Sequence, residues 1–302
     1  MTEFKHVVNK EDVNKKRPVR TLIRRHFDFS SRLRGKIKRE NLVFLNGKPI
    51  AGWIIPSEGD VLTIKMPRER SFFEPEDIPI KIIYEDEDLL VINKDPGIVV
   101  HPTHGYATHT VANAVTKYMM DTDQEFKIRF INRIDMDTSG LLVLGKNSHA
   151  QDNYMQQQKN GLVEKRYEAL VYGIIENDYG TIDAPIGKPD ITKAQRGVTE
   201  DGKPAISHYN VIERFDSGFT LVEVNLETGR THQIRVHMDY IGHTIVGDDF
   251  YGEANPDLIP RQALHAKYLS FRQPVTGKLL ELEAPLADDI NSLLAKLRNQ
   301  KL

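Results

Sequence analysis

FINRIDMDTSGLLVL, residues 130–144, is the stretch of this sequence that decides the fold. An arginine and two acids, Arg133, Asp135 and Asp137, stand just before a Thr-Ser-Gly turn. The turn leads into the apolar residues 141–144, and this pattern predicts a buried strand. Charged side chains on a loop that a core strand holds in place commonly form a reactive site. We therefore expect the chemistry of this protein to lie on this loop.

Length and composition limit the class of protein. The chain has 302 residues, which is enough for two domains with separate cores. It contains no cysteine, which excludes disulfides, thiolate metal sites and cysteine nucleophiles. No apolar run reaches the roughly 20 residues that span a bilayer, and the first residues lack the apolar stretch of a signal peptide. We expect a cytoplasmic protein with no membrane partner.

Charge is divided unevenly along the chain. Residues 1–72 contain 17 Lys and Arg against 8 Asp and Glu, a net charge of +9. The remaining residues contain 24 against 35, a net charge of −11. A basic N-terminal region on an acidic body favours a polyanionic partner. The alternative is a solvated basic face that binds no ligand.

The N-terminal region has the pattern of a small nucleic-acid-binding domain. Apolar residues at helical spacing predict helices over 19–27 and 32–39, each surrounded by basic side chains. A strand that runs into an Asn-Gly turn is expected in LVFLNGK (42–48), and after a turn at Gly59-Asp60 a second strand is expected at VLTI (61–64). These features resemble an S4-type RNA-binding domain, which implies contacts with RNA phosphates. The candidate RNA-binding residues are Arg24, Arg25, Arg32, Arg34, Lys36 and Lys38. The alternative is that these helices only pack on the second domain.

Domain boundaries follow from a charged segment with several prolines at residues 66–79, which we predict to be a linker. The predicted domains are residues 1–72 and residues 73–302. In the larger one, strands are expected over 80–84, 89–94, 163–173, 207–215 and 220–227, and helices over 110–120, 150–161 and 290–298. A further helix is expected to begin with Thr231 as its N-cap. Because strands and helices do not alternate regularly, we predict an α+β fold, with a mixed, largely antiparallel sheet and flanking helices.

Several common kinds of active site have no support in the sequence. His232 and His237 are five residues apart, which would place them on different faces of a helix, and His101, His104 and His109 belong to no metal-binding motif. The phosphate-binding patterns G-x-x-x-x-G-K-[ST] and G-x-G-x-x-G do not occur, nor does the G-x-S-x-G pattern of serine hydrolases. We expect neither a metal nor a cofactor.

Carboxylate chemistry remains. An Asp before a turn commonly forms that turn, and we interpret Asp137 in this way. Ser139 has no histidine nearby in the sequence and is expected to be structural. Asp135 has Arg133 two residues before it, and Arg230 lies in a second, glycine-led turn. Because a carboxylate that stays ionised in a shielded site needs a cationic partner, Asp135 is the candidate catalytic residue.

Four motifs in order resemble one family of enzymes. They are NKDPGIVVHP (93–102), RIDMDTSGLL (133–142), KRYEALV (165–171) and ETGRTHQIRVHM (227–238). They are similar to the motifs of the large-ribosomal-subunit type (RluA/RluD) family of pseudouridine synthases, with an S4-like domain attached. The sequence departs from the family at Asn132, where histidine is usual, and in the lysine–proline spacing after Lys94. We expect the first departure to affect how RNA is held.

The resemblance implies that the protein converts uridine in RNA to pseudouridine, by breaking the N1–C1′ bond and joining C5 to C1′. It implies that Asp135 is the catalytic residue, either as a nucleophile or as a base and electrostatic partner. By the same resemblance Arg230 pairs with Asp135, Tyr167 lies against the uracil, and Arg133 enters the RNA where the base has left. Further substrate contacts are assigned to Lys94, Ile234 and Leu264.

The expected partner is RNA, with ribosomal RNA favoured over transfer RNA, and the protein is expected to act as a monomer. Two other functions remain open. The first is an RNA-binding or ribosome-assembly factor without catalytic activity, which the basic N-terminal region and Asn132 would fit. The second is a carboxylate hydrolase that cleaves a glycosidic bond.

Overall fold

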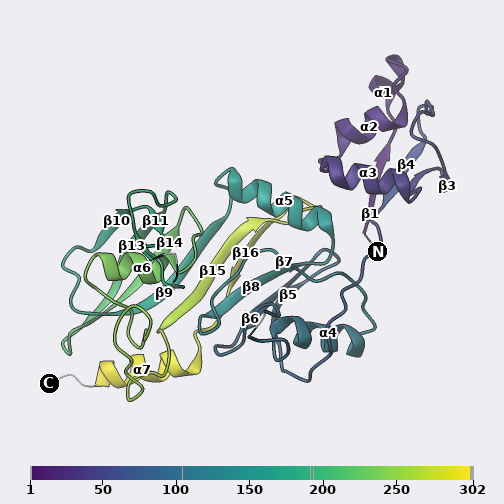
Figure 1. The fold of residues 1–302 in the computed structure, drawn as a ribbon. Coiled ribbons are helices and arrows are strands. Elements are labelled where there is room, and N and C mark those ends of the chain that lie inside the picture. Colours follow the sequence, from purple (N-terminus) through teal and green to yellow (C-terminus); the bar gives the residue numbers. More distant parts are fainter. Residues whose placement is uncertain (1, 104, 191, 193, 300–302) are drawn as a thin grey trace.

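A small N-terminal unit and a larger unit built around a long sheet make up the protein (Figure 1). The computed structural model describes residues 2–299 except 104, 191 and 193. The N-terminal unit comprises residues 2–66, and the larger unit comprises residues 80–299. Among these described residues, no helix has both the length and the apolar character needed to cross a lipid bilayer.

The N-terminal unit packs three helices on a four-stranded sheet of order β1-β4-β2-β3. Its elements are β1 (Glu3–Val7), α1 (Lys10–Asn14), α2 (Val19–His26), α3 (Ser31–Arg39), β2 (Val43–Leu45), β3 (Lys48–Pro49) and β4 (Val61–Lys65). Leu22, Leu33, Leu62 and Ile64 lie in its separate core. The two predicted helices are confirmed as α2 and α3, whereas β1 and α1 were not predicted.

The buried Asp12 carboxylate forms hydrogen bonds with residues of β1 and α2 at the start of this unit. The Asp12 carboxylate lies 2.7 Å from Nε2 of His6 and 2.8 Å from Nε2 of His26, and the two imidazole rings stack with centroids 3.7 Å apart. The Asn9 backbone N–H also donates to Asp12, closing a capping box on α1. Burial by itself raises the pKa of Asp12, but hydrogen bonds from His6, His26 and Asn9 outweigh burial and lower this pKa to about 2.

Acid should therefore destabilise the N-terminal unit through Asp12. Because the folded-state pKa lies below the ordinary value, the stabilisation is present above about pH 4 and is lost as the pH falls toward 2. We expect Asp12→Asn to lower the free energy of unfolding by about 1–3 kcal/mol at pH 6. Between pH 5 and pH 3, the free energy of unfolding should fall less steeply in this variant than in the wild type. Urea unfolding followed by fluorescence of Trp53, the single tryptophan, measures this unit. Glu11→Gln, at an exposed ion pair with Arg25, should change either quantity by less than about 0.5 kcal/mol; an equal effect of the two substitutions would contradict this account.

The larger unit contains a ten-stranded mixed sheet whose main path is β10-β13-β14-β9-β15-β8-β6-β5. Its strands are β5 (Lys81–Glu85), β6 (Leu89–Lys94), β7 (Arg129–Phe130), β8 (Ser139–Gly145), β9 (Glu164–Tyr172), β10 (Tyr179–Asp183), β13 (Ile206–Phe215), β14 (Phe219–Leu226), β15 (Leu264–Arg272) and β16 (Leu279–Glu283). A separate hairpin pairs β11 (Ile186–Gly187) with β12 (Gly197–Val198). Within the sheet, β8 and β15 pair in parallel and the other pairs are antiparallel. This confirms the predicted α+β fold with a largely antiparallel sheet.

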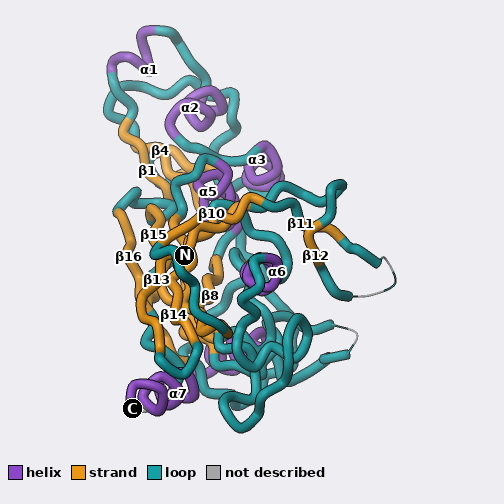
Figure 2. Tube along the Cα trace, turned by 90° about the vertical axis from the view of Figure 1, so that its left-hand side faces the viewer, coloured by secondary structure: helices purple, strands orange, loops and turns teal. Residues whose placement is uncertain are grey.

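Both faces of the sheet are covered near its centre. In β6, Leu90 and Ile92 join one core and Leu89 and Val91 join another, because successive side chains of a strand point to opposite faces. Strand β8 divides in the same way, which explains its unbroken apolar run. The first core also takes side chains from α4 (Val111–Asp121), α6 (Gln233–Tyr240) and α7 (Asp288–Asn299), and the second takes them from α5 (Ser148–Lys159). Figure 2 shows α6 and the loops around it on one side of the strands.

Gly140 allows the parallel strands β8 and β15 to meet. It pairs with Ala266 and has a φ of +110°. A Cβ at this position would lie 2.3 Å from the Ala266 carbonyl oxygen and 2.6 Å from the Ala266 nitrogen, much closer than atoms in a packed core approach. The sheet can therefore close here only around glycine.

Replacing Gly140 with alanine should destabilise the larger unit by about 3 kcal/mol or more, because backbone strain and the clash with β15 add together. Gly218→Ala is the matched control. Gly218 also has a positive φ, +86°, but a Cβ there would meet no atom within 4 Å. We expect it to cost only about 1–2 kcal/mol. Chemical unfolding followed by far-ultraviolet circular dichroism compares the two variants. Equal losses of unfolding free energy would show that the seam, the close contact of β8 and β15 at Gly140, does not require glycine.

The connection between the units, residues 66–80, contains neither helix nor strand, in agreement with a linker. It is nevertheless held at several points. The Glu69 carboxylate pairs with Lys36 of α3 at 2.8 Å and with Arg129 of β7. Phe4 also packs edge-on against the His149 ring of α5, with centroids 4.9 Å apart. These contacts join the N-terminal unit to the larger unit.

Candidate active site

Two buried cations hold the loop that carries Asp135. The Lys94 ammonium donates to the carbonyl oxygens of Met136 at 2.7 Å, Asp95 at 2.7 Å and Ile98 at 3.1 Å. The Arg261 guanidinium donates to the Asp137 carbonyl oxygen at 2.9 Å. The loop is therefore fixed through its backbone, and its side chains are left for other contacts.

Lys94 thus has a different position from the one predicted for it. Its side chain is only 2% exposed and lies behind the loop, where β6 ends. Burial, as the largest cause, lowers the pKa of Lys94 to about 7. The predicted contact between Lys94 and the substrate is corrected to a contact that positions the Asp135 loop.

Arg235 is the cation that faces Asp135. Its Nη1 lies 3.4 Å from Asp135 Oδ2, and its Nε and Nη2 make a two-pronged pair with the Asp248 carboxylate at 2.6 and 2.7 Å. Asp248 has no exposed surface. Burial lowers the pKa of Arg235, but the hydrogen bonds and charge of Asp248 outweigh it, and the net effect raises this pKa. A fully charged guanidinium is therefore aimed at Asp135 from α6.

The prediction that Arg230 pairs with Asp135 is wrong. Arg230 is exposed, and its Nε donates to the Pro204 carbonyl oxygen at 2.9 Å. It precedes α6, whereas His232 and Arg235 are three residues apart at the helix start and share one face. Helical spacing counted from His232 is the sequence signal that would have found Arg235.

Helix α6 begins differently from the prediction. Its N-cap residue is His232, in a left-handed conformation with φ +58°, and not Thr231. The Thr231 hydroxyl instead accepts a hydrogen bond from the exposed Arg133 side chain, with Nη2 and Oγ1 2.7 Å apart. His232 Nε2 lies 3.9 Å from Asp135 Oδ1, and its Nδ1 lies 2.8 Å from the Tyr251 hydroxyl. Burial lowers the pKa of His232, although Asp135 acts in the opposite direction.

An apolar wall faces the Asp135 carboxylate. Tyr167 on β9 is 9% exposed and lies in the main core with Ile134, Ile234 and Leu264. Burial, followed by the charge of Asp135, raises the pKa of the Tyr167 hydroxyl, so the ring is uncharged at neutral pH. The cleft has a volume of about 60 Å³, and Ile234 and Leu264 line it. Ligand sites usually measure about 300–1,000 Å³, so this cleft must widen to receive a nucleotide.

Two neighbours of the loop have structural roles. The Asn132 side chain accepts from the Val143 N–H at 2.7 Å and donates to the Leu141 carbonyl oxygen at 3.2 Å, so it extends the hydrogen bonding of β8. Ser139 does have a histidine partner, because His265 of β15 places Nδ1 2.9 Å from its hydroxyl. Ser139 and His265 are almost completely buried, and a substrate cannot reach them. Ser139 is structural as predicted, although its histidine was missed.

Histidines of the described chain can form either a metal site or hydrogen bonds within the fold. His237 is buried, with its ring nitrogens 2.8 Å from the Ser207 hydroxyl and 2.9 Å from the Ala184 carbonyl oxygen. Among the described residues, which do not include His104, the one cluster of three metal-type ligands is that of His6, Asp12 and His26. Its nitrogen–oxygen separations are those of hydrogen bonds, and it lies outside the Asp135 cleft.

The six basic residues predicted to contact RNA fall into three groups. Arg25 pairs with Glu11 at 3.0 Å and Lys36 with Glu69 at 2.8 Å. Arg32 is exposed on α3. The other three, Arg24, Arg34 and Lys38, line a groove of about 640 Å³ between α2, α3 and the segment after β3. Arg20 and Trp53 also line this groove and were not predicted.

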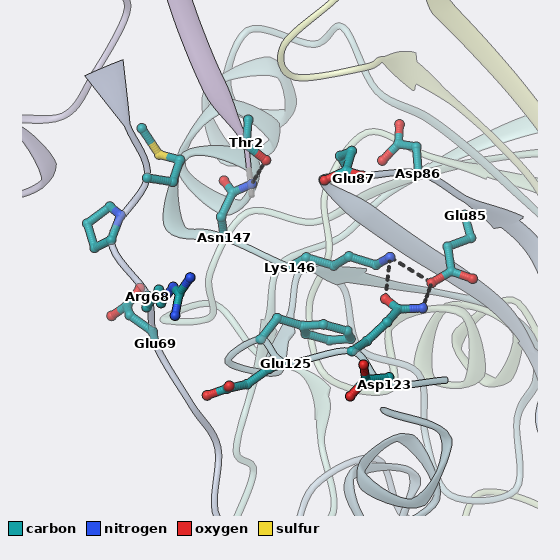
Figure 3. A pocket seen from close by; sticks show the side chains of 14 residues that line it. Thr2, Arg68, Glu69, Glu85, Asp86, Glu87, Asp123, Glu125, Lys146 and Asn147 are labelled. Atoms are coloured by element: carbon teal, nitrogen blue, oxygen red, sulfur yellow. Dashed lines mark hydrogen bonds and ion pairs between the residues drawn. The ribbon is translucent and has the colours of Figure 1, made fainter. Parts of the chain in front are cut away.

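A second cleft of about 630 Å³ lies between the two units (Figure 3). Most of its ionised side chains are acidic. They include Glu69, Glu85, Asp86, Glu87, Asp123 and Glu125, with Arg68 and Lys146 as the basic members. Lys146 is engaged, because its ammonium donates to Glu85 at 2.6 Å and to Gln124 at 3.0 Å. Such a surface repels a polyanion, so this cleft does not suit RNA.

Comparison with known proteins defines the class that this fold and cleft represent. The structure matches that of the human RNA Pseudouridylate Synthase Domain Containing 1, with a TM-score of 0.58 and 26% identity, over 75% of this chain and 98% of that chain. The fold is therefore that of an RNA pseudouridine synthase.

Sequence comparison gives the same class. A family model described as RNA pseudouridylate synthase matches residues 88–240. The uncharacterized RNA pseudouridine synthase YlyB of Bacillus subtilis is 42% identical over 86% of this chain and 87% of its own length. The ribosomal large subunit pseudouridine synthase D of Pseudomonas aeruginosa is 39% identical over 90% and 88%. The chain belongs to the RNA pseudouridine synthase family, as its motifs indicated, and it is an enzyme that isomerises uridine in RNA.

Proposed function

We propose that this enzyme forms pseudouridine in ribosomal RNA and that Asp135 is its catalytic residue. The observation that carries the proposal is the Asp135 carboxylate at a narrow cleft, opposite an apolar wall with Tyr167 and beside the Arg235 guanidinium. The choice of ribosomal RNA is supported by relatives named as ribosomal large subunit pseudouridine synthases.

The reaction transfers uracil from N1 to C5 on the same ribose, so nothing is oxidised and no water is consumed. The N1–C1′ bond breaks, a C5–C1′ bond forms, the C5 proton leaves and N1 gains a proton. Asp135 serves either by attacking the sugar or by acting as a base and stabilising the electron-poor ribosyl group. Both roles need an ionised carboxylate, and the Arg235 guanidinium, which also pairs with Asp248, lies 3.4 Å from it and favours that charge.

The neighbouring residues support the same chemistry. The uncharged Tyr167 ring, with Ile234 and Leu264, offers uracil an apolar surface once the base has left its helix. This surface also excludes water, which would otherwise capture the sugar or release the freed base. Arg133 is exposed beside the cleft and is proposed to fill the space that the flipped base leaves.

The proposal assigns RNA binding and catalysis to different units of the chain. Residues 1–72 form an S4-like RNA-binding domain, and residues 73–302 form the catalytic domain. Support comes from the separate core of the N-terminal unit and its basic groove. The acting species is a monomer, and the cytoplasm is its location, because ribosomal RNA is the proposed substrate.

The test is to incubate the purified enzyme with two RNA pools from cells that lack the gene, one of ribosomal RNA and one of transfer RNA. Nucleoside chromatography measures pseudouridine, and carbodiimide-blocked reverse transcription locates it. We expect new pseudouridine at defined positions of large-subunit ribosomal RNA. Conversion confined to transfer RNA would refute the proposal that ribosomal RNA is the substrate. Tight RNA binding without conversion in either pool would favour a binding or assembly factor, and release of free uracil would favour a hydrolase.

A further inference from the structure

The groove on the N-terminal unit combines an apolar floor with a basic rim. Its floor includes the buried side chains of Ile23, Ile37 and Val43. Its rim carries four basic residues, which are Arg20, Arg24, Arg34 and Lys38, together with Trp53. A groove with this composition suits a ligand that has a flat apolar part and a negatively charged part.

Trp53 is exposed and is nevertheless held in place. Its side chain is 70% exposed, which is unusual for a large aromatic residue. The flanking backbone is anchored to the start of α2, because the Arg20 N–H donates to the Gly52 carbonyl oxygen and the Val19 N–H donates to that of Ile54, both at 2.8 Å. A rigid segment thus presents an indole ring to solvent, and little conformational freedom is lost when a flat ligand stacks on it.

Cations at the rim are available for a ligand. Within the described chain, Arg20, Arg24 and Lys38 form no ion pair with any carboxylate, whereas Arg25 and Lys36 on the same helices do. Arg34 donates to the Phe29 carbonyl oxygen, which fixes its guanidinium at the groove. Three cations without a carboxylate partner therefore line the same groove as Trp53.

Gly35 leaves open space in the groove. It lies inside helix α3, where glycine is less stable than alanine. A Cβ there would meet no atom within 4 Å, so packing within the protein does not require glycine. Its φ is also not in the left-handed region. A ligand that approaches the helix backbone is a reason for glycine at this point.

We propose that this groove binds an unpaired nucleotide of the RNA substrate, with its base stacked on Trp53 and its phosphates on Arg20, Arg24 and Lys38. Stacking suits an unpaired base because a base inside a duplex has no free face. The N-terminal unit then recognises an RNA loop or bulge and not only a run of phosphates. This inference rests on the proposed RNA substrate.

The single tryptophan makes the contact directly observable. Titrating the full-length enzyme with a single-stranded oligoribonucleotide should quench the fluorescence of Trp53, whereas a blunt duplex with the same number of phosphates should leave it nearly unchanged. Quenching by neither RNA, or equal quenching by both, overturns the proposal. Fluorescence that changes only with an acidic peptide would identify a protein as the occupant and would also overturn it.

Substitutions separate stacking from charge. Trp53→Ala should weaken single-stranded binding at least about fivefold and duplex binding less than twofold, and Trp53→Phe should restore most of the loss. Lys38→Gln should reduce the salt dependence of binding by about one phosphate contact, whereas Trp53→Ala should leave it unchanged. Phe72→Ala, at an aromatic ring that is 90% exposed outside the groove, is the matched control. Gly35→Ala should stabilise the N-terminal unit and weaken RNA binding.

Two results distinguish failure of this inference from failure of the proposed function. If the wild-type enzyme forms pseudouridine and Trp53→Ala binds RNA normally, the inference alone fails. If the wild-type enzyme neither binds nor modifies RNA, both fail. For the stacked base we expect Trp53→Ala to raise KM while kcat at saturating RNA stays the same, because the groove is separate from the Asp135 cleft.

Discussion

Asp135→Asn is expected to abolish pseudouridine formation, with kcat reduced at least about 10³-fold. The amide occupies the same volume, but it cannot attack the sugar or take up a proton, and it carries no charge to stabilise a ribosyl cation. The loop itself should survive, because Lys94 and Arg261 hold its backbone and not this side chain. Single-turnover conversion of a defined RNA, followed by nucleoside chromatography, measures the loss.

The matched control for this prediction is Asp137→Asn, in the same loop two residues away. Arg261 binds the carbonyl oxygen of Asp137, so an amide side chain leaves this contact intact. We expect kcat to stay within a few-fold of the wild type. RNA affinity should be unchanged in both variants. If Asp135→Asn kept the wild-type rate, or if Asp137→Asn lost as much, Asp135 would not be the catalytic residue.

Arg235→Met is expected to cost both stability and activity. Removing the guanidinium leaves Asp248 charged, fully buried and without its cation, which should lower the free energy of unfolding by about 3–5 kcal/mol. The Asp135 carboxylate loses its partner in the same step. Urea unfolding followed by circular dichroism measures the first effect, and single-turnover conversion at a temperature where the variant is folded measures the second.

Arg230→Met is the control for Arg235→Met, since Arg230 is exposed and its side chain hydrogen-bonds only a backbone carbonyl among the described residues. It should change stability by less than about 0.5 kcal/mol. The double variant Arg235→Met with Asp248→Asn should recover part of the stability, because the buried charge is gone, but no activity. Full activity of Arg235→Met would show that Asp135 needs no cation.

The parts of the fold with a clear local period were predictable from the sequence. Helices α2 and α3 have one apolar side and mostly basic remaining positions, and β6 and β8 each contain four consecutive apolar residues, 89–92 and 141–144. In contrast, β1 was missed because its burial alternates between half-buried and exposed, and α1 because it is only five residues long. The parallel pairing of β8 with β15 joins distant segments, and no local pattern encodes it.

The site was predictable to the level of its loops but not of its contacts. The Asp135 loop, Tyr167 and the apolar residues Ile234 and Leu264 were found, and the structure brings them together at one cleft. The choice between Arg230 and Arg235 depends on where α6 begins, which the sequence leaves uncertain by a few residues. The ion pairs of Arg25 and Lys36 depend on which carboxylates the tertiary fold brings near them.

The seam between β8 and β15 also has a consequence for synthesis. It joins Ser139 to His265, which are 126 residues apart. Because chains leave the ribosome from the N-terminus, Asp135 emerges well before the strand that fixes its loop. A chain made only as far as β8 therefore carries Asp135 but lacks Arg235, Arg261 and Leu264, which contact its loop or line its cleft. Residues on both sides of the seam must therefore be made before the Asp135 cleft can form.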